Sequence, residues 1–388
     1  MVFKYIHSRR LAPGAAVLGG LLAAGVAQAQ AVTSADGYTI NHELSIVGGN
    51  GQDSDLPGYD SGAPFILSPV VINDNGVLAG QQQPQTGTYS GETIGFVGTT
   101  SITYSSNVSI TGINSSGDIV GVSNGSAFYA TPSDYTSAAP TQTLADPNSY
   151  GGSLHNTAPV GISDTGIVVG NNDGQDGANH AFSYLFEYSV AGNSFTDVAY
   201  PSSGDFAGNS GFQATAISGN GEFIAGDFTN AANIGEGFVY NTSTGVWSDF
   251  SDANAVSGIN VTGVNNSGEV AGWYSDNNLN ANNGYDVGFV YNAVSGAFVA
   301  DEIQDPANFS PANINAQGVP GSGTMVTGIN DSGELAGVIS GYQFAFTAEP
   351  SSFALPLPGS AWLMGGALAG LGALPRRKPT PVYLPRLD

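Results

Sequence analysis

A ten-residue pattern of apolar and polar positions recurs six times along the chain. In each copy an aliphatic residue precedes Asn or Ser, two mostly polar residues and a glycine follow, and two or three apolar residues lead to a closing glycine. An Asn or Ser at the first position of a type I turn accepts a backbone hydrogen bond, and a glycine at the fourth supplies a positive φ. The pattern predicts six β-hairpins, with turn glycines Gly76, Gly117, Gly166, Gly221, Gly268 and Gly333.

An aromatic strand is expected after each hairpin, at 94–97, 127–129, 181–184, 237–240, 288–291 and 344–346. Two repeats add a fourth candidate strand, at 245–247 and 296–298. The turn glycines are 41, 49, 55, 47 and 65 residues apart. Because propeller blades repeat about every 40–50 residues, we predict an all-β, propeller-like body of about six blades. A β-solenoid is the architectural alternative, although its rungs are usually shorter and more even.

These phrases resemble the extracellular repeats named HAF after a His-Ala-Phe triplet. His180, Ala181 and Phe182 match that triplet in full, and the other repeats have Gly-Phe or Ala-Phe at the equivalent place. The resemblance spans about residues 71–346 and implies an architecture rather than an activity, because function belongs to sites rather than folds.

Charge is sorted along the chain. All seven Lys and Arg residues lie in the two ends, and none lies between Ala31 and Pro375, whereas every acidic residue except Asp388 lies in that body. A body without cations cannot neutralise phosphate, so we expect no nucleic-acid partner. The chain has no cysteine, which excludes disulfides and thiolate metal sites.

The N-terminus has the pattern of a secretory signal peptide. Basic residues precede an apolar stretch from Ala15 to Val26, and Ala27 and Ala29 form the small-x-small pattern that signal peptidase cuts. We expect a signal peptide over residues 1–29, with cleavage after Ala29 or Ala31. An N-terminal membrane anchor is the alternative, but the run falls short of the ~20 residues that a spanning helix needs.

The C-terminus combines a proline-rich motif, an apolar run and a basic cluster. Leu355, Pro356, Leu357 and Pro358 lead into the apolar run 361–374, and Arg376, Arg377 and Lys378 follow at once. An apolar helix closed by basic residues is a stop-transfer pattern whose basic cluster stays in the cytoplasm.

This segment, residues 351–378, resembles the PEP-CTERM sorting signals, in the variant that begins Val-Pro-Leu-Pro-Ala; Leu355 and Gly359 replace its Val and Ala. The resemblance implies a Gram-negative-type bacterium and a protein held briefly in the inner membrane. An exosortase-type protease would then cut near the motif, and the product would reach the cell surface or the exopolysaccharide matrix of a biofilm. One further departure from the sorting signals is a tail, residues 379–388, that follows the basic cluster. An ordinary C-terminal membrane anchor is the alternative.

Between these ends we expect one extracellular β-repeat domain over residues 32–350. A non-enzymatic surface or matrix protein is the favoured function. A carbohydrate-binding module, with Trp273 and Tyr274 stacking on sugars, and a glycoside hydrolase with paired carboxylates are the alternatives.

Candidate chemistry in the body is sparse. The acidic segment 171–177 sits between a hairpin and its aromatic strand, and carboxylates on flexible turns suit Ca²⁺, so Asp173 and Asp176 are candidate calcium ligands. Residues 121–125 match G-x-S-x-G, but no helix is expected after them to form a nucleophile elbow. We therefore expect no catalytic residue and no cofactor other than this possible calcium.

Overall fold

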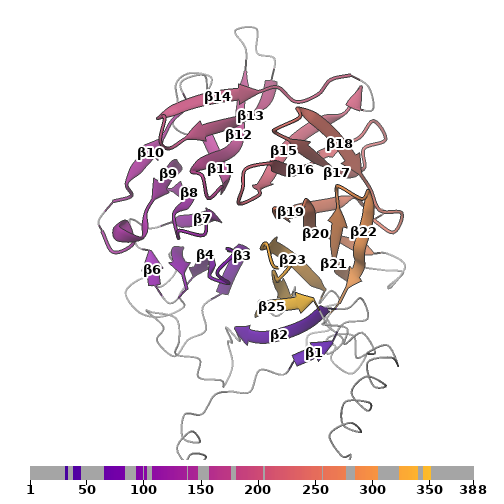
Figure 1. Cartoon of the computed structure of the whole chain (residues 1–388), viewed down its shortest axis with the longest axis horizontal. Coiled ribbons are helices and arrows are strands. Elements are labelled where there is room, and N and C mark those ends of the chain that lie inside the picture. The colour runs from indigo at the N-terminus through magenta and orange to yellow at the C-terminus, as the bar shows by residue number, and fades with distance from the viewer. Residues whose placement is uncertain are drawn as a thin grey trace, which may run out of the picture.

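The chain folds into a six-bladed β-propeller, as the sequence predicts. In the described residues, six antiparallel sheets surround a central axis, and the first strand of each repeat lies nearest that axis (Figure 1). The computed structural model describes residues 31–33, 38–44, 65–83, 93–98, 100–102, 107–137, 139–146, 157–175, 181–203, 206–255, 257–276, 285–304, 323–339 and 344–350.

Blades 1 to 3 each have four strands that run from the axis to the rim. Blade 2 also carries a short 3₁₀ turn, η1 (Pro132–Asp134), after its third strand. Blade 1 contains β3 (Phe65–Ile72), β4 (Leu78–Gln83), β5 (Ile94–Val97) and β6 (Thr100–Ile102); blade 2 contains β7 (Val108–Ile113), β8 (Ile119–Ser123), β9 (Ser126–Ala130) and β10 (Gln142–Leu144); blade 3 contains β11 (Thr157–Ile162), β12 (Ile167–Gln175), β13 (Ala181–Ser189) and β14 (Ser194–Val198).

Blades 4 and 5 repeat this arrangement, and blade 6 has five strands drawn from both ends of the described chain. Blade 4 contains β15 (Ser210–Ile217), β16 (Phe223–Thr229), β17 (Gly235–Asn241) and β18 (Val246–Phe250); blade 5 contains β19 (Ile259–Val264), β20 (Glu269–Asp276), β21 (Tyr285–Asn292) and β22 (Ala297–Ile303); blade 6 contains β23 (Thr324–Ile329), β24 (Leu335–Ile339), β25 (Phe344–Pro350), β2 (Tyr38–Leu44) and β1 (Ala31–Thr33).

The ring is closed by the N-terminal strand β2. It pairs antiparallel with β25, so that Tyr38 lies opposite Pro350 and Thr39 opposite Glu349. Ile40 is fully buried in a cluster that also contains Phe346 of β25. The segment that precedes the first repeat therefore completes the last blade, through residues about 300 positions apart in sequence.

In blades 3 to 6, a glycine on the second strand faces an aromatic ring on the third. Gly170 pairs with Phe186, and Gly226 with Phe238, and both phenylalanines are completely buried. A Cβ added to Gly170 would lie 2.5 Å from the Phe186 ring, and one added to Gly226 would lie 2.6 Å from Phe238. The closing glycine of the repeat phrase therefore makes room for the aromatic residue that follows it in sequence.

The innermost hairpins of blades 2 to 6 contain a β-bulge at the same place, whereas in blade 1 the register shifts earlier, between Leu67 and Val70. In blade 2 the register shifts between Ile110 and Gly112, and in blade 5 between Val261 and Gly263. A bulge re-aims the extra side chain. The extra residues Thr111 and Thr262 donate hydrogen bonds to backbone carbonyls of the next blade, at 2.7 Å and 2.9 Å.

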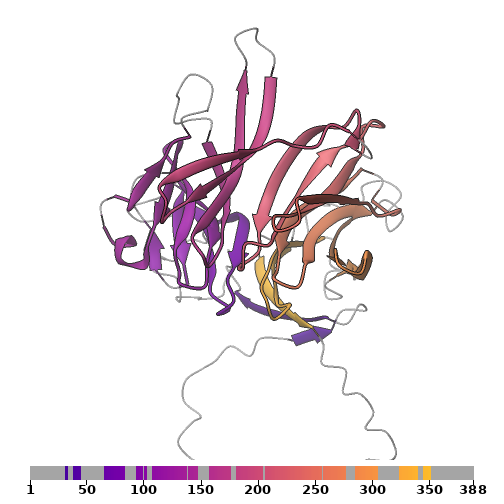
Figure 2. The same ribbon diagram turned by 45° about the horizontal axis from the view of Figure 1, so that its top comes forward.

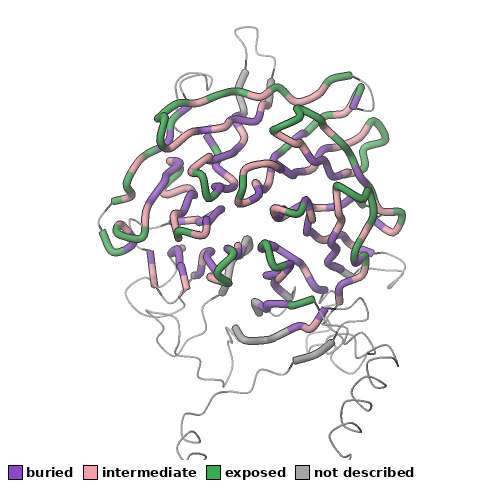
Figure 3. Tube along the Cα trace, in the orientation of Figure 1, coloured by how far each residue is buried: buried purple, intermediate pink, exposed green. Residues whose placement is uncertain are grey.

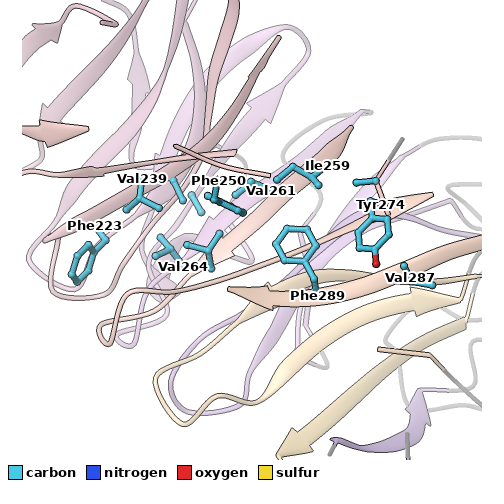
Figure 4. Packing of buried hydrophobic residues seen from close by; sticks show 13 residues of the cluster. Phe223, Val239, Phe250, Ile259, Val261, Val264, Tyr274, Val287 and Phe289 are labelled. Carbon is cyan, nitrogen blue, oxygen red and sulfur yellow. The ribbon is translucent and has the colours of Figure 1, made fainter. Parts of the chain in front are cut away.

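The core lies between neighbouring blades rather than in one central mass. Figure 3 shows buried segments on the inner strands and exposed segments along the rim. Between blades 4 and 5, Phe250 packs against Phe289 (Figure 4). Phe250 also stacks on Tyr291, with ring centroids 4.2 Å apart. Each blade covers the sheet face of its neighbour, and large aromatic side chains fill the space between the two faces. This packing explains why aromatic residues recur in every repeat.

Some predicted elements fall outside the described residues. These include the signal peptide, the C-terminal apolar run and the sorting motif. Within the described residues, no helix reaches the length and apolarity needed to cross a bilayer.

The hairpin formed by β12 and β13 rises above the neighbouring blades (Figure 2).

Candidate functional site

The turns of the six inner hairpins gather around one end of the propeller axis, where they appear as exposed segments near the centre of Figure 3. Asn73 shows how each turn is built. Its Oδ1 accepts the backbone N–H groups of Asn75 and Val77 at 3.1 Å and 2.9 Å. Asn114, Asn265 and Asn330 close their turns in the same way.

Asparagine in these turns also links one blade to the next. The Nδ2 of Asn73 donates to the carbonyl of Asn114 at 2.9 Å, and that of Asn330 donates to the carbonyl of Asn73 at 3.3 Å. Blades 3 and 4 have Ser163 and Ser218 instead, whose hydroxyls close the turn through the N–H groups of Ile167 and Phe223, both at 3.0 Å. Serine keeps the turn but has no amide with which to reach the neighbouring blade.

The next residue of each phrase completes a ring of inter-blade hydrogen bonds. Asp74 Oδ1 accepts the N–H of Asp331 at 2.8 Å, and Asp331 Oδ1 accepts the N–H of Asn266 at 2.7 Å. Asp164 Oδ1 accepts the N–H of Ser115 at 2.7 Å. These side chains therefore hold each turn against its neighbour at the mouth of the axis.

Three carboxylates converge at this mouth. The Ser115 hydroxyl lies 2.9 Å from Asp74 Oδ2 and 3.0 Å from Asp164 Oδ2. The pKa of Asp331 is raised, first because burial disfavours its charge and also because Asp74 and Asp164 are negative, although N–H donation from Asn266 opposes the shift. The mouth of the axis is thus a site of negative potential.

The space beneath the carboxylates is small. The mouth encloses about 50 Å³, and the channel below it about 60 Å³. Small-molecule sites usually occupy ~300–1,000 Å³, so these cavities have room for water rather than for a sugar ring. A ring of aliphatic side chains separates the two levels: Ile72, Ile113, Ile162, Ile217, Val264 and Ile329.

The chemistry available at the mouth is hydrogen-bond acceptance and attraction of cations. Within the described residues, no group of three or more His, Cys, Asp or Glu side chains could hold a metal ion. Ser123, the serine of the G-x-S-x-G match, ends β8 and leads through Asn124 and Gly125 directly into β9. No helix follows it, so the strand, turn and helix of a nucleophile elbow are not formed there.

The six predicted turn glycines all have positive φ, as the turn chemistry requires. Their φ angles range from 72° at Gly76 and Gly268 to 85° at Gly117. The sequence analysis placed these turns but not the ring they form, since the residue after Asn or Ser varies among Asp, Ser, Gly and Asn. The one signal for the ring was that this variable position is polar in five of the six phrases.

The expected calcium loop has a different structure from the one predicted. Residues 171–175 belong to strand β12 rather than to a flexible turn, and Asn171 holds the next blade through Ala214, bonding its carbonyl and its N–H at 2.8 Å each. The side chain of Asp173, and Asp176 entirely, lie outside the described residues, as do Ala27, Ala29 and the predicted sorting residues.

Tyr274 does not face solvent as a sugar-stacking residue would. It is completely buried, and its hydroxyl donates to the carbonyl of Asp301 at 2.8 Å. The exposed large hydrophobic residues of the described chain are Ile234, Val246, Val294 and Val299, and none of them is aromatic. The suggestion that Tyr274 stacks on a sugar is therefore wrong.

Similarity to known proteins is limited to distant structural neighbours. No family model and no curated protein matches the chain. Among solved structures, the β-propeller domain of the Trilobed protease from Pyrococcus furiosus is 11% identical, with a TM-score of 0.40, over 72% of this chain and 80% of that one. A sialidase from Trypanosoma rangeli is 12% identical, with a TM-score of 0.39, over 88% of this chain and 61% of that one.

Proposed function

We propose that the chain is a non-enzymatic scaffold, exported to the cell surface or to an exopolysaccharide matrix after both of its ends have been removed. The supporting observation is where the propeller begins and ends. Its first strand, β1, starts at Ala31, and its last strand, β25, ends at Pro350. Cleavage after Ala29 and near Leu355 would therefore cut no strand of the described fold.

The inter-blade contacts support a scaffold role for the polar residues that recur in the repeat. The carboxylates at the mouth of the axis accept backbone N–H groups of neighbouring turns, so their placement is explained by ring closure. A rigid, acidic body without Lys or Arg would stay soluble and resist proteases that cut at basic residues. Both properties suit a protein that remains among extracellular polymers.

Processing is tested by analysing the protein recovered outside the cells. Trypsin should leave the mature body whole, since no Lys or Arg lies between Ala31 and Pro375. Cleavage at acidic residues should yield a C-terminal peptide that ends upstream of Trp362. Replacing Pro356 and Pro358 together with Ala should keep the protein in the membrane fraction, whereas Arg386→Ala in the tail should not. Secreted protein that contains residues 362–374 would refute the processing proposal.

A further inference from the structure

The outermost strand of blade 6 begins directly after a candidate cleavage site. This strand, β1, contains Ala31–Thr33, and all three of its residues pair with β2. The residue before it is Gln30, which follows the small-x-small pattern of Ala27 and Ala29. The signal peptide and the folded body therefore meet at Gln30.

The extent of β1 distinguishes the two candidate cuts. Cleavage after Ala31 would remove the residue that pairs with Asn41 and leave β1 with two of its three pairs. Cleavage after Ala29 keeps all three pairs. Because β1 is so short, the loss of one pair would be a large part of what holds it to the sheet. The fold thus favours the cut after Ala29, which makes Gln30 the first residue of the exported chain.

A glutamine at the N-terminus can react with itself. Its α-amine attacks Cδ of its own side-chain amide, the new N–Cδ bond closes a five-membered lactam, and the bond from Cδ to Nε2 breaks to release ammonia. Both reacting groups belong to one residue, so proximity favours the reaction and no second molecule is needed. An α-amino group has a pKa of about 7.7–8.0, so roughly a tenth of it is unprotonated and nucleophilic at pH 7.

Ring closure at Gln30 is compatible with the fold. The lactam forms from the α-amine and the side chain, and the peptide bond to Ala31 is not broken. The three pairs between β1 and β2 begin at Ala31, opposite Asn41, so they are kept in the cyclised chain.

The processed body contains no other primary amine. The two lysines of the chain are Lys4 and Lys378, and both lie outside the span from Gln30 to the proline-rich motif at 355–358. Cyclisation would therefore remove both the only primary amine and its positive charge. Amines form Schiff bases with carbonyl compounds, and the reducing ends of sugars are such compounds. A chain without amines would be inert toward them.

We propose that the exported protein begins at Gln30 and that this residue is cyclised to pyroglutamate, which leaves the processed chain without a primary amine. The modification rests on the export and processing proposed above. It suits a protein that remains among polysaccharides, and it also protects the first strand of the fold from aminopeptidases, which require a free α-amine.

The N-terminal peptide of the protein recovered outside the cells tests the modification. The protein is held at about pH 8, where much of an α-amine is unprotonated, and is then cleaved at acidic residues. The peptide 30–36 should be lighter by one ammonia than its encoded sequence. A peptide that keeps an uncyclised Gln30, or one that starts at Val32, would overturn the proposal. Recovery of residues 1–29 on the extracellular protein would instead refute removal of the signal peptide.

Counting amines with an amine-reactive ester gives an independent readout. The wild-type protein should take up no label, whereas Gln30→Glu should take up one label per chain, because a carboxylate is a much poorer electrophile than an amide. Gln28→Glu, the same change within the removed segment, should remain unlabelled. The mass of the N-terminal peptide confirms that each variant is cut at the same bond. Equal labelling of wild type and Gln30→Glu would overturn cyclisation.

Discussion

At the scale of single residues, one side chain per repeat often determines how two blades meet. Asn171 of blade 3 bonds both the N–H and the carbonyl of Ala214 in blade 4. Asp227, at the equivalent position of blade 4, lies against β19 and accepts the N–H of Val261. A carboxylate can accept that N–H but, when ionised, cannot donate to a carbonyl as the amide of Asn171 does.

Asp227→Asn should stabilise the protein at neutral pH. Burial raises the pKa of Asp227 from 3.8 to about 6, although the Val261 N–H opposes the shift. A raised folded-state pKa gives stability that is complete below about pH 4 and is lost as the pH rises through about 6. The gain above pH 6 should reach up to about 3 kcal/mol, since one pKa unit is worth about 1.4 kcal/mol.

Urea unfolding of both proteins from pH 4 to pH 8 measures this gain. The difference in free energy of unfolding should grow across that range. Asp249→Asn, which changes an exposed carboxylate on β18, should stay within about 0.5 kcal/mol throughout. An equal difference at pH 4 and pH 8 would show that ionisation of Asp227 is not its cause.

A turn glycine should be replaceable only by residues that tolerate positive φ. Gly166 has a φ of 76°, and a Cβ there would meet its nearest neighbour at 3.6 Å, so space is not the constraint. Gly166→Val should cost about 1–3 kcal/mol through backbone strain. Gly166→Asn should cost less, because Asn adopts the left-handed region more readily. Equal unfolding free energies for the two variants would contradict the strain argument.

At the scale of strands, the sequence predicted the strands that carry their own apolar pattern. It did not predict short strands or the pairing of strands far apart in sequence. The aromatic strand at 94–97 is β5 as observed, because its apolar run carries the information by itself. A fourth strand was expected in two repeats, yet β6 and β10 complete blades 1 and 2 with three residues each, too few to show an alternating pattern. The pairing of β2 with β25 has no local signal, since neither strand contains the hairpin phrase.

Ile40 tests whether β2 belongs to the fold. Its side chain is completely buried against blades 5 and 6, so Ile40→Ala should lower the free energy of unfolding by about 2–5 kcal/mol. Thr39→Ala, on the other face of β2 and partly exposed, should change it little. Denaturant unfolding of both variants is the measurement, and a silent Ile40→Ala would place β2 outside the propeller.

At the scale of the whole molecule, charge opposes compactness. Thirty carboxylates, all acidic residues but Asp388, lie in a body without Lys or Arg. Their mutual repulsion destabilises the folded state, and salt screens it over a Debye length of about 10 Å at 0.1 M. The melting temperature should therefore rise when NaCl is increased from about 0.02 M to about 0.5 M, because the Debye length shortens markedly over that range. The salt in this experiment should be a chloride rather than a sulfate, because sulfate also strengthens the burial of apolar surface. A melting temperature that falls with NaCl would contradict this account.

The central claim is that one chain closes its own ring by pairing the N-terminal strand β2 with the last strand, β25. The chain has no cysteine, so Thr39→Cys with Glu349→Cys introduces a single possible disulfide between directly opposed residues. Opposed strand residues lie about 4.5–5.5 Å apart at Cα, within the range a disulfide spans. The control pairs Thr39→Cys with Thr347→Cys, two positions out of register, where the separation is about 7–8 Å. Mass spectrometry after mild oxidation should show an intramolecular disulfide in the first variant and free thiols in the control. Free thiols or only intermolecular bonds in the first variant would contradict closure of the ring by β2.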